Sequence, residues 1–171
     1  MSRARNMADG GYNVAFPAGH VLQVLQFEDS ETNALTTSYV NYWEKSVTLK
    51  SASSDVFITF TYQYYLAPGA GLGMKVYRNS SATVTTSHTA VWTKNKADTG
   101  EHPSTIWKSF SGQSLNGVST QVMRDVVSGA SAGDTLYYGF FFRKMDSAVV
   151  RTPDDETEDG FFTAIFTEVQ K

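Results

Sequence analysis

The sequence has 171 residues, the size of a single domain that buries roughly 70% of its unfolded surface. Fourteen basic and seventeen acidic side chains give a net charge of -3, which favours neither nucleic acid nor an anionic membrane surface as a partner. The chain has no cysteine, so disulfides, thiolate nucleophiles and zinc ribbons are excluded. No apolar stretch approaches the ~20 residues of a membrane span, and we expect neither a secretory signal nor membrane insertion.

The first segment, residues 1–18, is predicted to be an extended N-terminal arm, and residues 19–171 a single domain. The arm has a Gly10-Gly11 pair and little apolar patterning. We expect it to become ordered against a partner protein, where Arg3 and Arg5 meet carboxylates and Phe16 leads into the first strand. We therefore predict that Arg3, Arg5 and Phe16 anchor the chain.

The rest of the chain has the composition of β-strands, because Val, Thr and aromatic residues are abundant while Leu and Ile are scarce. A period of two is clearest at 55–62 and 135–144, and the second of these has aromatic residues in both phases, which predicts a strand covered on both sides. About ten strands follow from such patterns and from turn residues between them. The predicted strands are 21–27, 39–42, 46–50, 55–62, 74–78, 89–93, 105–110, 120–127, 135–144 and 161–169.

Two charged segments, 94–103 and 151–160, are predicted to be exposed loops at the outward end of the molecule. The second carries five carboxylates, which could gather a calcium ion but lack the spacing and the glycine of an EF-hand loop. A solvated, charged loop is the favoured interpretation, with a calcium-dependent contact to another surface as the alternative. The five are Asp154, Asp155, Glu156, Glu158 and Asp159.

Signals for catalysis are weak. The three histidines are dispersed, and the glycine-rich run 69–75 is followed by a predicted strand, not by the helix that a phosphate loop requires. We therefore predict a protein that is not an enzyme and that needs no cofactor or metal.

Aromatic residues are more numerous than one core of this length obviously needs. A core accounts for most of them, but strands that are apolar in both phases also favour a subunit interface. We predict that a subunit interface draws on five of them, with a sugar-stacking platform as a further possibility. These are Tyr62, Tyr138, Phe140, Phe142 and Phe162.

Several short segments resemble bacteriophage virion proteins. They are Ala18 to Val24, the run SVTLKSASSDVFI at 46–58, the run MKVYRN at 74–79, the last strand TAIFTEV at 163–169, and the start SRARNMAD, which is similar to that of some phage tail-fibre proteins. The likeness extends along the whole chain. It implies a structural protein of the virion, made in the host cytoplasm.

A second likeness concerns architecture. Gly133-Asp134-Thr135-Leu136, followed later by Gly160-Phe161-Phe162-Thr163-Ala164, resembles the final strands of trimeric jelly rolls of the tumour-necrosis-factor and complement-head type. This resemblance implies a homotrimer, and we predict that its interface draws on the five aromatic residues named above.

Together these features predict an all-β jelly-roll β-sandwich of about ten strands, acting as a non-enzymatic virion module. Its place is either a tail fibre or appendage that attaches to the host, or a decoration of the capsid. The expected partners are two further copies of the chain, other virion proteins bound by the arm, and a host surface glycan. A carbohydrate-binding module is the main alternative, and a cupin-like enzyme is disfavoured because its histidine cluster is missing.

Overall fold

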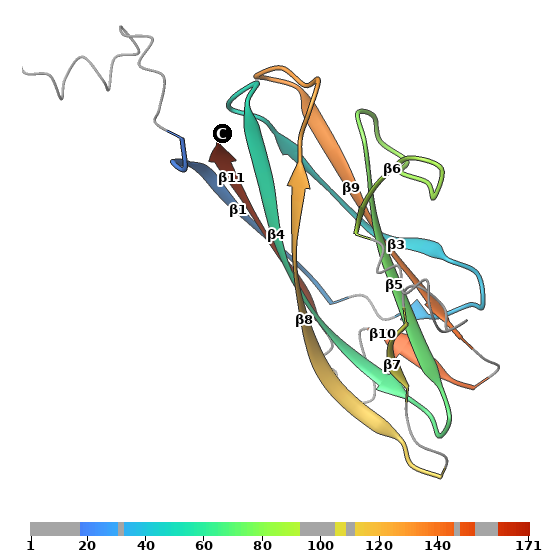
Figure 1. Cartoon of the computed structure of the whole chain (residues 1–171). Coiled ribbons are helices and arrows are strands. Elements are labelled where there is room, and N and C mark those ends of the chain that lie inside the picture. Colours follow the sequence, from blue (N-terminus) through green and yellow to red (C-terminus); the bar gives the residue numbers. More distant parts are fainter. Residues whose placement is uncertain (1–17, 31–32, 93–104, 109–111, 146–147, 153–160) are drawn as a thin grey trace, which may run out of the picture.

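The computed structural model describes residues 18–30, 33–92, 105–108, 112–145, 148–152 and 161–171. They form two antiparallel sheets packed face to face (Figure 1). The six-stranded sheet contains β1 (Val21–Asp29), β2 (Asn33–Ala34), β4 (Ser54–Leu66), β8 (Leu115–Val126), β10 (Val150–Thr152) and β11 (Phe162–Gln170). The five-stranded sheet contains β3 (Val40–Thr48), β5 (Gly71–Asn79), β6 (Thr89–Trp92), β7 (Thr105–Lys108) and β9 (Thr135–Lys144). The predicted all-β sandwich is thus confirmed.

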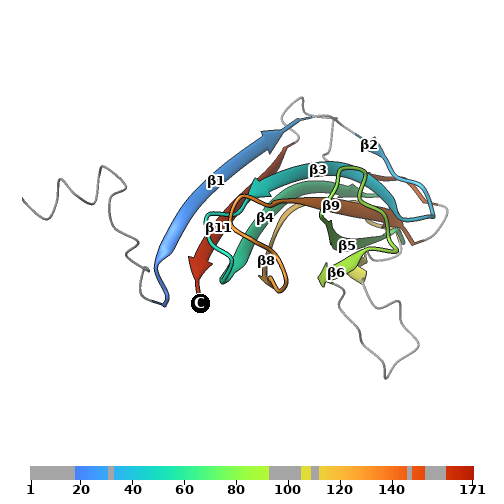
Figure 2. The same ribbon diagram turned by 90° about the horizontal axis from the view of Figure 1, so that it is seen from above.

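The chain passes repeatedly from one sheet to the other. In the six-stranded sheet the order is β1-β11-β4, with β8 along the other edge of β4 and with β10 and β2 beyond the end of β11. In the five-stranded sheet it is β3-β9-β5, with β6 and β7 pairing with different parts of β5. Seen from above, the strands curve around the shared interior (Figure 2). This order is compatible with a jelly roll.

The core lies where alternate residues of β4 meet alternate residues of β9. Ile58, Phe60 and Tyr62 are fully buried, and so are Tyr138 and Phe140. The ring centroids of Phe60 and Phe140 lie 4.3 Å apart, which joins the two sheets directly. Such aromatic pairs add to the stabilisation that burial of apolar area provides.

The second face of β9 is also covered, as its pattern predicted. Phe141 packs edge to face on Tyr77, with ring centroids 5.4 Å apart, and Val84 completes a small second cluster. The segment that carries Val84 is held down by Glu44, whose carboxylate accepts hydrogen bonds from the backbone N–H groups of Thr83 and Val84 at 3.0 and 2.7 Å. Gly139 lies beneath this cluster, where a Cβ would come within 2.8 Å of the Phe141 ring.

Most strands occur where the pattern predicts them, with three differences. The predicted strands 39–42 and 46–50 are one strand, β3, which bulges between Asn41 and Trp43. Asn116-Gly117, which has the composition of a turn, lies inside β8, where Gly117 passes so close to Tyr64 that a Cβ would lie 2.6 Å from its hydroxyl oxygen. The short strands β2 and β10 have no sequence signal, because they are too short to show a period.

One buried carboxylate organises an end of the six-stranded sheet. Glu168 has no exposed surface, and its oxygens accept hydrogen bonds from the backbone N–H groups of Lys50 and Ser51 at 3.0–3.1 Å. The Ser54 hydroxyl and the Gln23 amide donate to it at 2.8 and 2.6 Å. With its acceptor sites filled, the charge ties the connection between β3 and β4 to β11 and β1.

A second carboxylate, Asp55, carries an ion-pair network nearby. Arg124 pairs with it from β8, and the Lys171 Nζ lies 2.9 Å from its Oδ1. Burial alone would raise the pKa of Asp55, but Lys171 and Arg124 outweigh it and bring the pKa below its ordinary value of 3.8.

The stabilisation from Asp55 should therefore depend on pH. Because its pKa is lower in the folded than in the unfolded chain, its contribution is present above the unfolded pKa and is lost as the pH falls through the folded pKa. We expect wild type to exceed Asp55→Asn in unfolding free energy at about pH 7, and the difference to shrink towards about pH 2. Urea unfolding across this range measures it. Asp29→Asn, which removes the carboxylate 4.0 Å from Lys45, is the control; a difference that stays constant with pH would contradict the assignment.

Candidate functional site

The five aromatic residues predicted to form a trimer interface lie in the interior of a single chain. All have at most 1% of their surface exposed. The rings of Phe142 and Phe162 stack 5.6 Å apart across the two sheets, and the Tyr138 hydroxyl donates to Asp125 at 2.8 Å. The prediction that these side chains contact another subunit is wrong, because inward-facing positions of both sheets are already filled by one another. The full set is Tyr62, Tyr138, Phe140, Phe142 and Phe162.

The other predicted site residues lie outside the described residues. These are the anchor residues Arg3, Arg5 and Phe16 and the acidic-loop residues Asp154, Asp155, Glu156, Glu158 and Asp159. Those predictions therefore stay predictions.

The most exposed apolar surface is instead on the outer face of the six-stranded sheet, meaning the side that faces away from the core. On β8, Val118, Val122 and Val126 are 56%, 68% and 56% exposed, and Val24 on β1 is 58% exposed. They point outward because strand side chains alternate and Ser119, Met123 and Asp125 occupy the inward phase. Large exposed apolar side chains on one face make that face a candidate interaction surface.

The strand register shows how this face is composed. Thr59 of β4 pairs with Ile165 on one side and Val122 on the other, and the next outward row joins Thr163, Thr61 and Thr120. The hydroxyls of Thr61 and Thr120 are hydrogen-bonded at 2.9 Å. These six adjoining positions carry no charge.

Charged side chains lie at the two ends of this uncharged area. Arg124 stands over Phe57 at 5.7 Å from its ring centroid, and Arg151 over Tyr65 at 5.8 Å. A centre without charge and a charged or polar rim are features that protein interfaces share.

The outer face of the five-stranded sheet is different. The segment with Val84 covers one part of it. In another part Lys75 and Arg143 lie 4.5 and 4.7 Å from the centroid of the Tyr39 ring. Gly73 makes room for this arrangement, since a Cβ there would come within 2.8 Å of the Tyr39 hydroxyl oxygen. The outer face of the six-stranded sheet is thus open, with an uncharged centre and charged residues around it, whereas the outer face of the five-stranded sheet is partly covered and is cationic around Tyr39.

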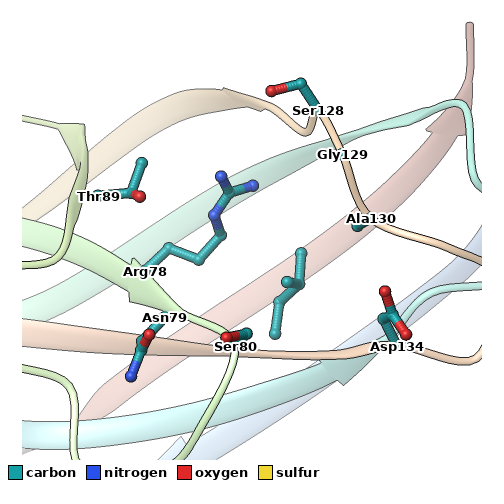
Figure 3. Close-up of a pocket in the computed structure, with 9 residues that line it drawn as sticks. Arg78, Asn79, Ser80, Thr89, Ser128, Gly129, Ala130 and Asp134 are labelled. Carbon is teal, nitrogen blue, oxygen red and sulfur yellow. The ribbon is translucent and has the colours of Figure 1, made fainter.

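A polar hollow of about 220 Å³ opens at one end of the sandwich (Figure 3). It lies between the end of β5 and the connection from β8 to β9 (Figures 1 and 3). Arg78 enters it from β5, and its Nη1 is 3.0 Å from an Asp125 carboxylate oxygen. Burial raises the pKa of Asp125, and Arg78 opposes this shift. The other lining residues are Asn79, Ser80, Thr89, Ser128, Gly129, Ala130, Asp134 and Leu136.

Neither surface was identified from the sequence. The valines of β8 share one phase of a strand, but phase alone does not show which side faces the core, and the pairing of Asn116-Gly117 was not foreseen. The hollow combines two distant chain segments, which no local pattern relates.

Two further observations concern the part of the chain that the structure describes. No helix there is long and apolar enough to cross a membrane. Within the same residues, no group of three or more His, Asp or Glu side chains is arranged to hold a metal ion.

The fold places the protein among β-sandwiches. No protein-family model matches the sequence, and no curated protein matches it either. Among solved structures, a protein from Bacillus endospore appendages, described as disulfide-linked pili, is 11% identical with a TM-score of 0.36, over 93% of this chain and 97% of that chain.

Two other solved structures are similar at the same low level. The CBM22-1 xylan-binding domain of Paenibacillus barcinonensis Xyn10C is 11% identical with a TM-score of 0.30, over 91% of this chain and 97% of that one. The VP2 subviral particle of infectious bursal disease virus is 11% identical with a TM-score of 0.29, over 87% of this chain and 42% of that chain.

The core assignment of the aromatic residues can be tested with Phe142→Ala. We expect a loss of about 3–5 kcal/mol in unfolding free energy, because the substitution leaves a cavity between the sheets. Chemical denaturation at several protein concentrations measures the loss. A core residue gives the same loss at every concentration, whereas a loss that disappears on dilution would indicate a subunit contact.

Proposed function

We propose that this protein is a non-enzymatic structural module on the surface of a bacteriophage virion, and that it assembles into a homotrimer through the outer face of its six-stranded sheet. The observation that carries the assembly is the exposed valines Val118, Val122 and Val126 of β8, which lie beside uncharged, Thr-rich rows of β4 and β11, with the exposed Val24 of β1 at the far edge of the sheet. Burying this face in a contact between copies removes apolar surface from water.

The geometry of the face supports a specific contact. Its centre includes the Thr61 and Thr120 hydroxyls, which are already hydrogen-bonded to each other, so this pair can be buried at little cost. Arg124 and Arg151 stand at its rim, where charges select a partner and its orientation. The proposed number of subunits, three, comes from the resemblance to trimeric jelly rolls.

The virion role comes from the resemblance to phage proteins. In this proposal the arm, residues 1–18, binds another virion protein through Arg3, Arg5 and Phe16. The module then serves either as a tail appendage that attaches to the host or as a decoration of the capsid. The loop predicted at 151–160 is shorter than expected, because Arg151 and Thr152 belong to β10 and Thr152 is buried. The loops 94–103 and 153–160 would face outward.

The assembly surface can be tested with Val122→Glu, alone and with Val118→Glu. Both side chains are more than half exposed, so the substitutions should leave the fold intact while placing charge in the contact. Sedimentation equilibrium should give a trimer mass for the wild type at micromolar concentration and a monomer mass for the double variant. Thr48→Glu, at an exposed position of β3 in the five-stranded sheet, is the control away from this face and should remain trimeric. A monomeric wild type would overturn the proposed assembly.

The location can be tested with antibody to this chain and electron microscopy of the phage particle. We expect label on assembled particles, on the tail for an appendage or on the head for a decoration protein. Particles without label, alongside labelled free protein in the same lysate, would overturn the virion role.

A further inference from the structure

We propose that the hollow at the end of the sandwich is a binding site for a neutral saccharide, a single sugar ring or the end of a glycan chain. The site takes Arg78 from β5 and Asp134 from the turn before β9 as its two polar walls, with Leu136 among its lining residues (Figure 3). Its biological meaning, contact with host glycans, rests on the proposed virion function, but the binding itself does not.

The first wall is fixed in place. The Tyr138 hydroxyl and the Arg78 Nη1 both donate to Oδ2 of Asp125, at 2.8 and 3.0 Å. Tyr138 is fully buried and Asp125 is 5% exposed, so the guanidinium is supported from within the core. A guanidinium has five N–H donors, and the bond to Asp125 uses one of them. The head of Arg78 is directed into the space between Thr89 and the segment Ser128–Ala130 (Figure 3).

The second wall supplies an acceptor. One oxygen of Asp134 accepts a hydrogen bond from the Ser131 N–H at 2.8 Å, which orients the carboxylate while its residue stays exposed. Hydroxyl groups of Ser80, Ser128 and Thr89 surround the hollow. A sugar hydroxyl both donates and accepts, so it can bridge a donor wall and an acceptor wall, while the C–H groups of the ring pack on Leu136 and Ala130.

Charge and size restrict the ligand further. Asp125 balances the charge of Arg78, which leaves Asp134 as the uncompensated charge and disfavours phosphate, sulfate or a carboxylate. The volume of about 220 Å³ is below the range of sites for drug-sized ligands and suits one small ring. A neutral polyhydroxyl ligand meets all of these conditions.

The test uses the full chain, with saturation-transfer NMR for the methyl glycosides of glucose, galactose and N-acetylglucosamine and with 31P line broadening for inorganic phosphate as the anionic probe. We expect transfer to at least one glycoside. Ser128→Trp, at an exposed position that lines the hollow, should abolish it by filling the space. Asp134→Asn should weaken binding about tenfold, since an amide is a poorer acceptor than a carboxylate.

Ser131→Trp is the matched control, because Ser131 is exposed in the same turn but does not line the hollow. It should bind as the wild type does. No transfer to any of the three glycosides, binding of phosphate in their place, or equal loss in Ser128→Trp and Ser131→Trp would overturn the proposal. The Val118→Glu, Val122→Glu double variant should still bind, so a failure of the assembly proposal and a failure of the sugar site are distinguishable.

Discussion

The structure depends on the packing of β4 against β9 across the sandwich. Phe60 and Phe140 meet there at 4.3 Å between ring centroids, and Trp43 contacts both at 5.7 and 5.4 Å. β4 also pairs with β8 and β11, and β9 with β3 and β5, so this one contact aligns the central strands of both sheets. Large aromatic side chains suit this place because each buries much apolar area with few rotatable bonds.

That packing also determines which surface remains for partners. Side chains alternate along a strand. The residues of β4 in the same phase as Phe60 point into the core, so the residues between them point outward. These are Phe57, Thr59, Thr61, Gln63 and Tyr65. The outer face is thus a consequence of the core, and β8 extends it with its exposed valines.

Two buried carboxylates connect distant elements of the fold. Glu168 ties the β3–β4 connection to β11 and β1, and Asp125 joins Arg78 to Tyr138 between the sheets. Each carboxylate accepts several hydrogen bonds, which offsets the cost of removing its charge from water. The hydrogen bonds of Asp125 hold Arg78 at the hollow, so a polar network in the core also shapes a candidate binding site.

The sequence by itself determined the all-β class, the positions of most strands and the double cover of β9, because a period of two is a local property that alternating Phe, Tyr and Val display directly. Only the tertiary structure decided that Tyr62, Tyr138 and Phe140 fill the core of one chain and that Val122 faces outward. The reason is that both phases of β4 and β9 contain large apolar residues, so the choice of the inward phase depends on which strands pair and which sheets face each other. Those contacts join residues such as Phe60 and Phe140, 80 positions apart, and no local pattern encodes them.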